Sequence, residues 1–144
     1  MRIRKGKPSD AAVLLKLLNA DELQSGLDDN DTIYSPEWVN ACLTSPNTDL
    51  VLVAEEEGQI IGFLIAEIWR KKHFSYLSDI YVRPELRKGG VASALLNKYK
   101  AFCNEQDLRF IQCAVLTSNR GMQGWCKAHG FKRGREFYFY GKRL

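Results

Sequence analysis

The stretch that decides the fold is Ile80–Leu96, IYVRPELRKGGVASALL. A run of β-forming residues ends just before Pro84, and a run typical of a helix begins at Val91. Between them, Gly89 and Gly90 let the backbone turn tightly and come close to a ligand. The first N–H groups of the helix and the positive end of its dipole would face that ligand. The stretch therefore predicts a strand–turn–helix unit with the character of an anion site.

The loop alone leaves the kind of site open. Arg87 and Lys88 add positive charge beside the turn, but a junction with a purely structural role fits these residues equally well. Spacing excludes two nucleotide sites. A Walker A loop needs Gly-Lys-Ser or Gly-Lys-Thr after four spacers, and a dinucleotide site needs Gly-x-Gly-x-x-Gly; neither pattern is present.

Hydrophobic periodicity extends the prediction to the rest of the chain. In chain order, we expect a strand at 3–4, helices over 11–18 and 35–43, strands over 50–55, 59–69 and 76–82, a helix over 91–102, a strand over 110–116, a helix over 119–129 and a final aromatic strand over 136–142. Glu57-Gly58 marks a hairpin turn between two of these strands. Helices and strands mixed around one sheet predict an α+β fold.

Composition limits the classes of protein. A length of 144 residues, with 45% hydrophobic and 26% charged residues, fits a single soluble domain over residues 1–144. No secretory signal and no membrane-spanning run is apparent, which favours a cytoplasmic location. Four cysteines without a Cys-x-x-Cys pair indicate reduced thiols, and His73 and His129 suggest no metal pair. A net charge of +4 suits a phosphorylated cofactor and does not require nucleic acid.

Two ordered motifs carry a family resemblance. Arg87-x-x-Gly90-x-Ala92 resembles the pyrophosphate-binding signature of the GNAT acyltransferases, and it follows the expected strand at the place that this family uses. Farther on, Asn119, then Trp125 and then Gly130-Phe131 resemble the later motif of the same family. With the opening Ile3-Arg4-x(3)-Pro8-x-Asp10, the resemblance covers nearly the whole chain.

The resemblance implies a fold and a cofactor site. It implies one GNAT-like domain with a central mixed, mostly antiparallel sheet of six to seven strands, flanked by helices and splayed at the acyl-CoA site. Acetyl-CoA would be the cosubstrate, with no metal involved. The residues implied to hold it lie at the strand end, in the loop and at the start of the later motif: Ile80, Tyr81, Val82, Arg87, Lys88, Gly89, Gly90, Val91, Ala92, Ser93 and Asn119.

Amide formation from a thioester needs a base for the amine and an acid for the departing thiolate. Asp79 is the first candidate base and Glu67 the second, although either carboxylate fits an ordinary structural role as well. Many relatives have a tyrosine as the acid seven residues after the Asn, where this chain has Cys126. Cys126 is therefore a candidate acid or a small packed side chain, and Tyr138, Tyr140 or an unprotonated thiolate are alternatives.

The acceptor is left open by the sequence. The stretch Asp21–Asp31 is acidic and lies where this family selects its acceptor, which favours a cationic amine such as a polyamine, an aminoglycoside or a Lys-bearing peptide. A solvated loop is the alternative. Some relatives that act on protein N-termini have a Glu where this chain has Ala114, which weakens that analogy.

The leading hypothesis is an N-acetyltransferase that moves an acetyl group from acetyl-CoA to a primary amine by direct attack in a ternary complex. A CoA-binding module with little turnover is the second hypothesis. A nucleic-acid-binding domain, supported only by charge and the aromatic segment Phe137–Tyr140, is the third and is disfavoured. No membrane partner is expected, and both a homodimer and a monomer fit the final strand.

Overall fold

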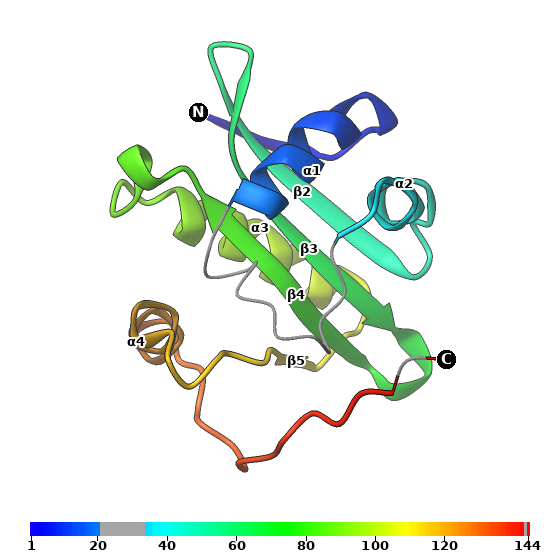
Figure 1. Ribbon diagram of the computed structural model, residues 1–144, viewed down its shortest axis with the longest axis vertical. Helices are drawn as coiled ribbons and strands as arrows, with labels where there is room; N and C mark the ends of the chain where they lie inside the picture. Colours follow the sequence, from blue (N-terminus) through cyan, green and yellow to red (C-terminus); the bar gives the residue numbers. More distant parts are fainter. Residues whose placement is uncertain (21–33, 143) are drawn as a thin grey trace.

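The computed structural model describes residues 1–20, 34–142 and 144, so the acidic stretch Asp21–Asp31 lies outside the described residues. One five-stranded sheet has the order β1-β2-β3-β4-β5, with helices on both sides (Figure 1). The strands are β1 (Arg2–Lys5), β2 (Asp49–Glu56), β3 (Gln59–Trp69), β4 (Phe74–Val82) and β5 (Phe110–Gln112). The α-helices are α1 (Ala11–Ala20), α2 (Pro36–Thr44), α3 (Val91–Glu105) and α4 (Arg120–Ala128).

The sheet is mixed and mostly antiparallel, as predicted. Strands β1 to β4 pair antiparallel in sequence order, and β5 pairs parallel with β4 after the α3 crossover. The turn between β2 and β3 has Glu57 at φ 50° and Gly58 at φ 77°, both in the left-handed region. Two such residues match the right-handed twist of a tight hairpin, which explains why Glu57-Gly58 marks this turn.

Each face of the sheet has its own hydrophobic cluster. Helix α3 covers one face and packs Leu95, Leu96 and Tyr99 against side chains of β2, β3 and β4. Helices α1 and α2 cover the opposite face, where Leu14 and Val39 pack against β2, β3 and β4. Figure 1 shows α1 and α2 in front of the sheet and α3 behind it. We call the front side the α1/α2 face.

The N-terminal motif forms a buried ionic cluster. The Arg4 guanidinium donates to both carboxylate oxygens of Asp10 at 2.8 and 3.0 Å and to Glu55 of β2 at 2.8 Å. Burial would raise the pKa of Asp10, but Arg4 and the backbone N–H of Lys7 hold it below the ordinary value. The motif thus ties β1 to the start of α1 and has a structural role here.

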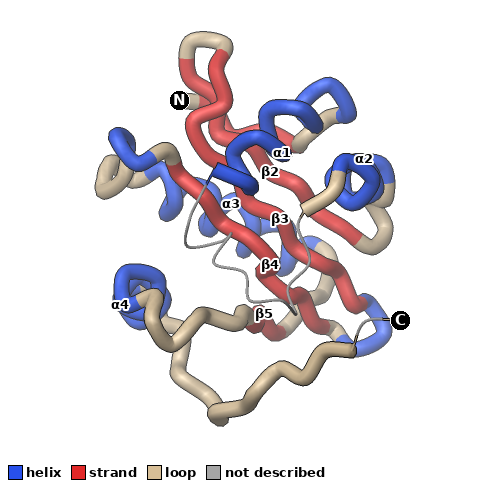
Figure 2. Tube along the Cα trace, viewed as in Figure 1, coloured by secondary structure: helices blue, strands red, loops and turns tan. Residues whose placement is uncertain are grey.

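The prediction of six to seven strands is wrong, because the described residues form five. The expected strand over 110–116 is shortened to β5, and the expected strand over 136–142 does not form. Figure 2 shows the chain after α4 as loop throughout its drawn length. Residues with high β-propensity form a strand only where a partner strand is present. β5 has only three residues, so it provides few backbone groups with which another strand could pair. Phe137 to Tyr140 therefore remain 64–95% exposed.

Strands β4 and β5 part soon after they meet. Their ladder joins only Phe74–Tyr76 of β4 to Phe110–Gln112 of β5. From Leu77 to Val82, β4 pairs with β3 on one side and has no ladder to a described strand on the other. The resulting open edge lies just before the glycine turn and agrees with the predicted splay.

None of the described helices is long and apolar enough to cross a membrane.

Candidate active site

The glycine turn is built by three successive features. A 3-10 turn at Pro84–Leu86 ends β4 because proline cannot continue a ladder. Lys88 at φ 66° and Gly90 at φ 83° then adopt left-handed conformations. A Cβ added at Gly90 would meet no atom within 4 Å, so this position faces open space. The chain thus reverses direction and enters α3 at Val91, whose side chain is buried.

Backbone donors collect at this turn. The N–H groups of residues 89–93 donate to no other residue in the part of the chain that the structure describes. The backbone hydrogen bonds of α3 begin at Ala94, whose N–H donates to Gly90 O at 3.0 Å. Unpaired amides and the positive end of the helix dipole favour an anionic ligand. The turn therefore has the character of an anion site, as predicted from the sequence.

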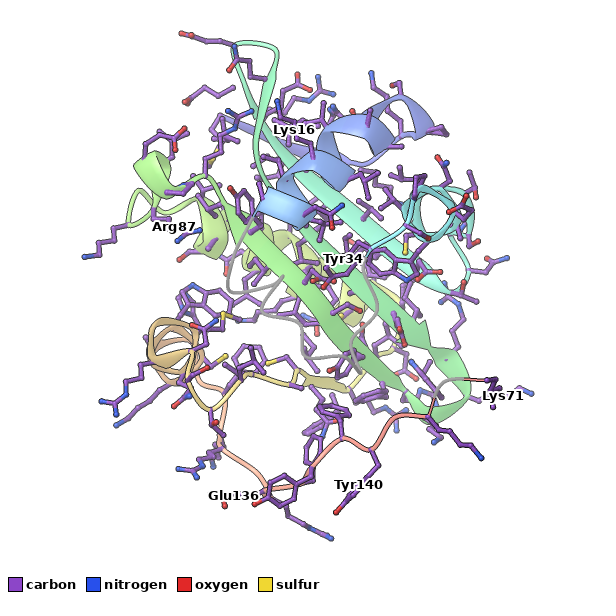
Figure 3. All side chains as sticks on the ribbon, viewed as in Figure 1. Lys16, Tyr34, Lys71, Arg87, Glu136 and Tyr140 are labelled. Atoms are coloured by element: carbon purple, nitrogen blue, oxygen red, sulfur yellow. The ribbon has the colours of Figure 1, made fainter. Side chains whose placement is uncertain are left out.

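The Arg87 side chain contacts the end of β4, the strand that precedes the turn. Its Nε donates to Val82 O at 3.0 Å, and its Cζ lies 5.8 Å from the centre of the Tyr81 ring. Figure 3 shows Arg87 beside the loop that precedes α3. The contacts hold the guanidinium at the end of β4, so its charge adds to that of the helix dipole.

At the end of the sheet nearest the glycine turn, the backbones of β3 and β4 lie very close together. A Cβ at Gly62 would lie 2.7 Å from Tyr81 O and 3.2 Å from a methyl carbon of Val91. Only glycine therefore lets β3, β4 and the start of α3 meet at this distance. Gly62 belongs to the predicted hairpin, but its effect on the turn follows from the packing and has no signal in the sequence.

Asp79 is a buried carboxyl on the α1/α2 face, one residue before the predicted cofactor-binding segment Ile80–Val82. It is 6% exposed, and the Tyr34 hydroxyl donates to its Oδ1 at 2.6 Å. Burial raises the pKa of Asp79 to about 6, and the hydrogen bond from Tyr34 works against this rise. The carboxylate is consequently a stronger base than an exposed aspartate, and it stays largely ionised at neutral pH.

Glu67 shares the α1/α2 face with Asp79 but is not its direct cross-strand neighbour. On β3, Glu67 lies opposite Tyr76, whereas Asp79 lies opposite Ile65. A cavity of about 570 Å³ is lined by Thr48, Asp49 and Glu67–Lys72. The Glu67 carboxylate accepts from Trp69 Nε1 at 3.2 Å. Glu67 therefore lies toward the far end of the strands from the glycine turn.

Asn119 and Cys126 both lie on or beside α4, next to β5. Asn119 is the N-cap of α4, where its Oδ1 accepts from Met122 N at 3.0 Å. Cys126 is 8% exposed, and its Sγ lies 3.9 Å from Cys113 Sγ. Burial raises the pKa of Cys126, which weakens the thiol as an acid. The structure shows a capping role for Asn119 and a packing role for Cys126; their roles toward a cofactor stay predictions.

A family model named acetyltransferase (GNAT) family matches residues 14–131, which is more than half of the chain. The chain belongs to the GNAT family. The predicted family and the predicted enzyme class, an N-acetyltransferase, are confirmed.

Relatives agree with this placement. The uncharacterized N-acetyltransferase YhfO of Bacillus subtilis is 23% identical over 145 residues, covering 97% of this chain and 95% of YhfO. The PaiA N-acetyltransferase from Thermoplasma acidophilum, solved in complex with coenzyme A, has a TM-score of 0.81 at 20% identity, covering 91% of this chain and 89% of its own. The aminoglycoside N-acetyltransferase AAC(6')-Iy, solved with CoA, has a TM-score of 0.79 at 22% identity, covering 99% and 95%. These likenesses confirm the α+β GNAT fold.

Two residues of this GNAT site have no signal in the sequence. Tyr34 reaches Asp79 from outside any motif, and Figure 3 shows it over the middle of the sheet. Cys42 of α2 is buried, and burial, with smaller effects from the carboxylates of Asp49, Asp79 and Glu67, raises its pKa to about 12. Tertiary packing brings these groups together, and spacing along the chain could not have predicted it.

No group of three or more metal-ligating side chains occurs among residues 1–20, 34–142 and 144.

Proposed function

We propose that this GNAT protein transfers an acetyl group from acetyl-CoA to a cationic primary amine, and that Asp79 accepts the proton of the amine. The observation that carries this proposal is the position of Asp79. It is a buried carboxyl with a pKa raised to about 6, in the part of β4 beyond the end of the ladder with β5 and one residue before Ile80. A base with a raised pKa competes better for the proton of an amine than an ordinary aspartate does.

The residues of the loop fit the cofactor. The unpaired amides of residues 89–93 would bind the pyrophosphate, and the open space at Gly90 would let it approach the backbone. Residues 80–82 of β4 lie beyond the end of the ladder with β5, and this segment would lie along the pantetheine arm. Acetyl-CoA, when bound, supplies an acetyl group activated as a thioester.

Asp79 would then act on the acceptor. The amine nitrogen forms a bond to the acetyl carbon, its proton passes to the Asp79 carboxylate directly or through water, and the electron pair of the C–S bond leaves with the sulfur. Glu67 lies farther along the same face and is proposed to attract the amine rather than to take its proton. Cys126 is the proposed proton donor to the sulfur. Burial raises the pKa of its thiol, and the contact with Cys113 works against this rise.

Charge supports a cationic acceptor. The sheet register places Asp49, Glu67 and Asp79 on the α1/α2 face with Val51 and Ile65. Asp49 and Glu67 form no ion pair with any described residue. The Asp21–Asp31 stretch adds acidic residues to the same chain. AAC(6')-Iy, which shares this fold, has been solved with the bisubstrate analogue CoA-S-monomethyl-acetylneamine.

A matched pair of glycine variants tests the cofactor site. Gly90→Ala and Gly58→Ala both place a Cβ at a left-handed residue with open space around it, so each should lower the free energy of unfolding by about 1–2 kcal/mol. Only Gly90→Ala should also weaken acetyl-CoA binding, by about tenfold, because its Cβ enters the proposed pyrophosphate cradle. Calorimetric titration measures the affinity.

Two results would contradict the proposal. Equal acetyl-CoA affinity in the two variants would place the cofactor elsewhere. Binding to the wild type without release of free CoA over a panel of cationic amines would instead support the second candidate, a CoA-binding module. The substitution of Cys126 for the usual tyrosine favours that alternative.

A further inference from the structure

A hydrogen bond joins the proposed cofactor loop to the end of α4. Ser93, in the first turn of α3, has its Oγ 2.9 Å from Nε2 of His129, which follows the last residue of α4. Ser93 belongs to the proposed pyrophosphate cradle, whereas His129 has no part in the proposed chemistry. The contact therefore connects an ionisable side chain to the place where an anion would bind.

The second nitrogen of His129 fixes the direction of this hydrogen bond. Nδ1 lies 2.8 Å from the carbonyl oxygen of Trp125, and a carbonyl oxygen only accepts. Nδ1 must therefore carry a hydrogen, which leaves Nε2 of the neutral ring as an acceptor. Ser93 then donates its hydroxyl hydrogen to His129, and the hydrogen points away from the cradle.

Protonation of His129 reverses the direction. Both ring nitrogens of an imidazolium donate, so Nε2 would donate to Ser93 Oγ. The hydroxyl hydrogen of Ser93 would then be released to donate elsewhere, beside a backbone N–H of the same residue that has no acceptor among the described residues. The protonated state thus adds a donor and a positive charge next to the cradle.

Among the described residues, the surroundings of His129 provide no counter-ion for this charge. The Trp125 ring lies against the imidazole, tilted by 31° with centroids 4.4 Å apart, and can stabilise a cation. No ion pair or hydrogen bond joins the ring to any charged side chain of the described residues. The ionisable groups on the packed elements are Arg87, Lys88, Lys98, Tyr99, Lys100, Cys103 and Glu105 in and before α3, Arg120, Cys126 and Lys127 on α4, and Cys113, Lys132 and Arg133 beside it. Most are cationic, so a bound anion would be the partner of the imidazolium.

We propose that binding of the CoA pyrophosphate is coupled to protonation of His129 through Ser93, so that the affinity for CoA rises as the pH falls. This inference rests on the proposed function, because it needs the cofactor to bind at the start of α3. By linkage, a ligand that favours the protonated ring takes up a proton on binding, and the dissociation constant changes by up to about tenfold per pH unit in the coupled range.

The test measures binding of 3′-dephospho-CoA by calorimetry between pH 6 and pH 8. This ligand lacks the phosphomonoester, whose own ionisation near pH 6 would otherwise add to the signal. Titrations in buffers with different ionisation enthalpies give the number of protons taken up. We expect wild type to take up a fraction of a proton near neutral pH and to bind at least about fivefold more tightly at pH 6 than at pH 8.

Variants assign the proton. His129→Gln and Ser93→Ala should bind with an affinity that changes less than about twofold over this range, whereas Ser93→Thr, which keeps the hydroxyl, should retain the wild-type dependence. The chain has only two histidines, so His73→Asn is the matched control; it leaves the coupling intact and suits the left-handed backbone of His73. NMR titration of the two imidazoles in the wild type gives the same answer without any substitution.

The outcomes separate the two proposals. Wild-type binding that does not depend on pH, or a dependence that survives in His129→Gln, would overturn the coupling and leave the proposed function standing. An imidazole resonance of His129 that does not move toward the protonated position on ligand addition would do the same. Absence of any binding by the wild type would overturn both.

Discussion

At the residue scale, the proposed base Asp79 has a raised pKa, and this affects the stability of the fold. Its pKa is raised from 3.8 to about 6, so the folded protein binds a proton more tightly than the unfolded chain does. For such a group, the stabilising contribution is complete below pH 3.8 and is lost as the pH rises through about 6. At neutral pH the buried charge therefore destabilises the fold.

Replacing this charge should make the protein more stable. Asp79→Asn keeps the size and the acceptor for the Tyr34 hydroxyl, and we expect it to raise the free energy of unfolding by about 1–3 kcal/mol at pH 7.5. The difference should shrink toward zero below about pH 4, where aspartate is protonated in both states. Urea unfolding at several pH values measures it. An Asp79→Asn variant less stable than wild type at pH 7.5 would contradict the assigned pKa.

Tyr34 should set the pH at which Asp79 ionises. Its hydrogen bond lowers the pKa of Asp79, so Tyr34→Phe should raise that pKa and move the acid limb of kcat/KM to higher pH by about 0.5–1 unit. The phenylalanine retains the ring contact with Trp38. Tyr140→Phe is the control, because the Tyr140 side chain is 95% exposed and lies on the C-terminal segment (Figure 3). An acid limb that stays in place in Tyr34→Phe would show that the hydrogen bond does not tune the base.

Sequence reasoning succeeds at the residue scale where a role depends on local backbone. Gly90 is predicted because a tight turn before a helix needs a left-handed residue, and the structure places it at φ 83°. Tyr34 is missed because its contact with Asp79 spans 45 residues and has no period or motif. The same holds for the contact of Cys113 with Cys126, which depends on how α4 docks beside β5.

At the element scale, the junction of β3, β4 and α3 is the part of the fold that positions the proposed cofactor loop. Gly62→Ala would force a Cβ to 2.7 Å from Tyr81 O and should lower the free energy of unfolding by about 1–3 kcal/mol. The same substitution should weaken acetyl-CoA binding. Gly124→Ala is the matched control: it meets no atom within 4 Å inside α4 and should stabilise the protein by about 0.5–1 kcal/mol. Chemical denaturation measures both. A neutral Gly62→Ala would mean that β3 and β4 can separate without cost.

The elements also show why some predictions succeed and others do not. Helix α3 and the β2–β3 hairpin have strong periodicity and clear turn residues, so both were predicted in place. The length of β5 and the formation of the expected final strand depend on which neighbouring strand is available for pairing. Phe137 to Tyr140 are strong β-formers that pair with no described strand, and local sequence does not contain that information.

At the scale of the whole molecule, the proposed reaction joins two separate parts of the sheet. The glycine turn and the open edge of β4 would receive the cofactor, and the carboxylates of the α1/α2 face would receive the amine. Asp79 lies between them, since it is one residue from the cofactor segment and shares a face with Glu67. This arrangement makes Asp79 the residue on which the proposed function depends most.

The most direct measurement is the pH dependence of CoA release by wild type and Asp79→Asn, from pH 5 to pH 9, with acetyl-CoA and a panel of cationic amines. We predict that wild-type kcat/KM rises through about pH 6 and that Asp79→Asn lowers kcat by about 10²–10⁴ at neutral pH while its affinity for acetyl-CoA is unchanged. An Asp79→Asn variant with the rate and acid limb of the wild type would contradict the assignment of Asp79 as the base.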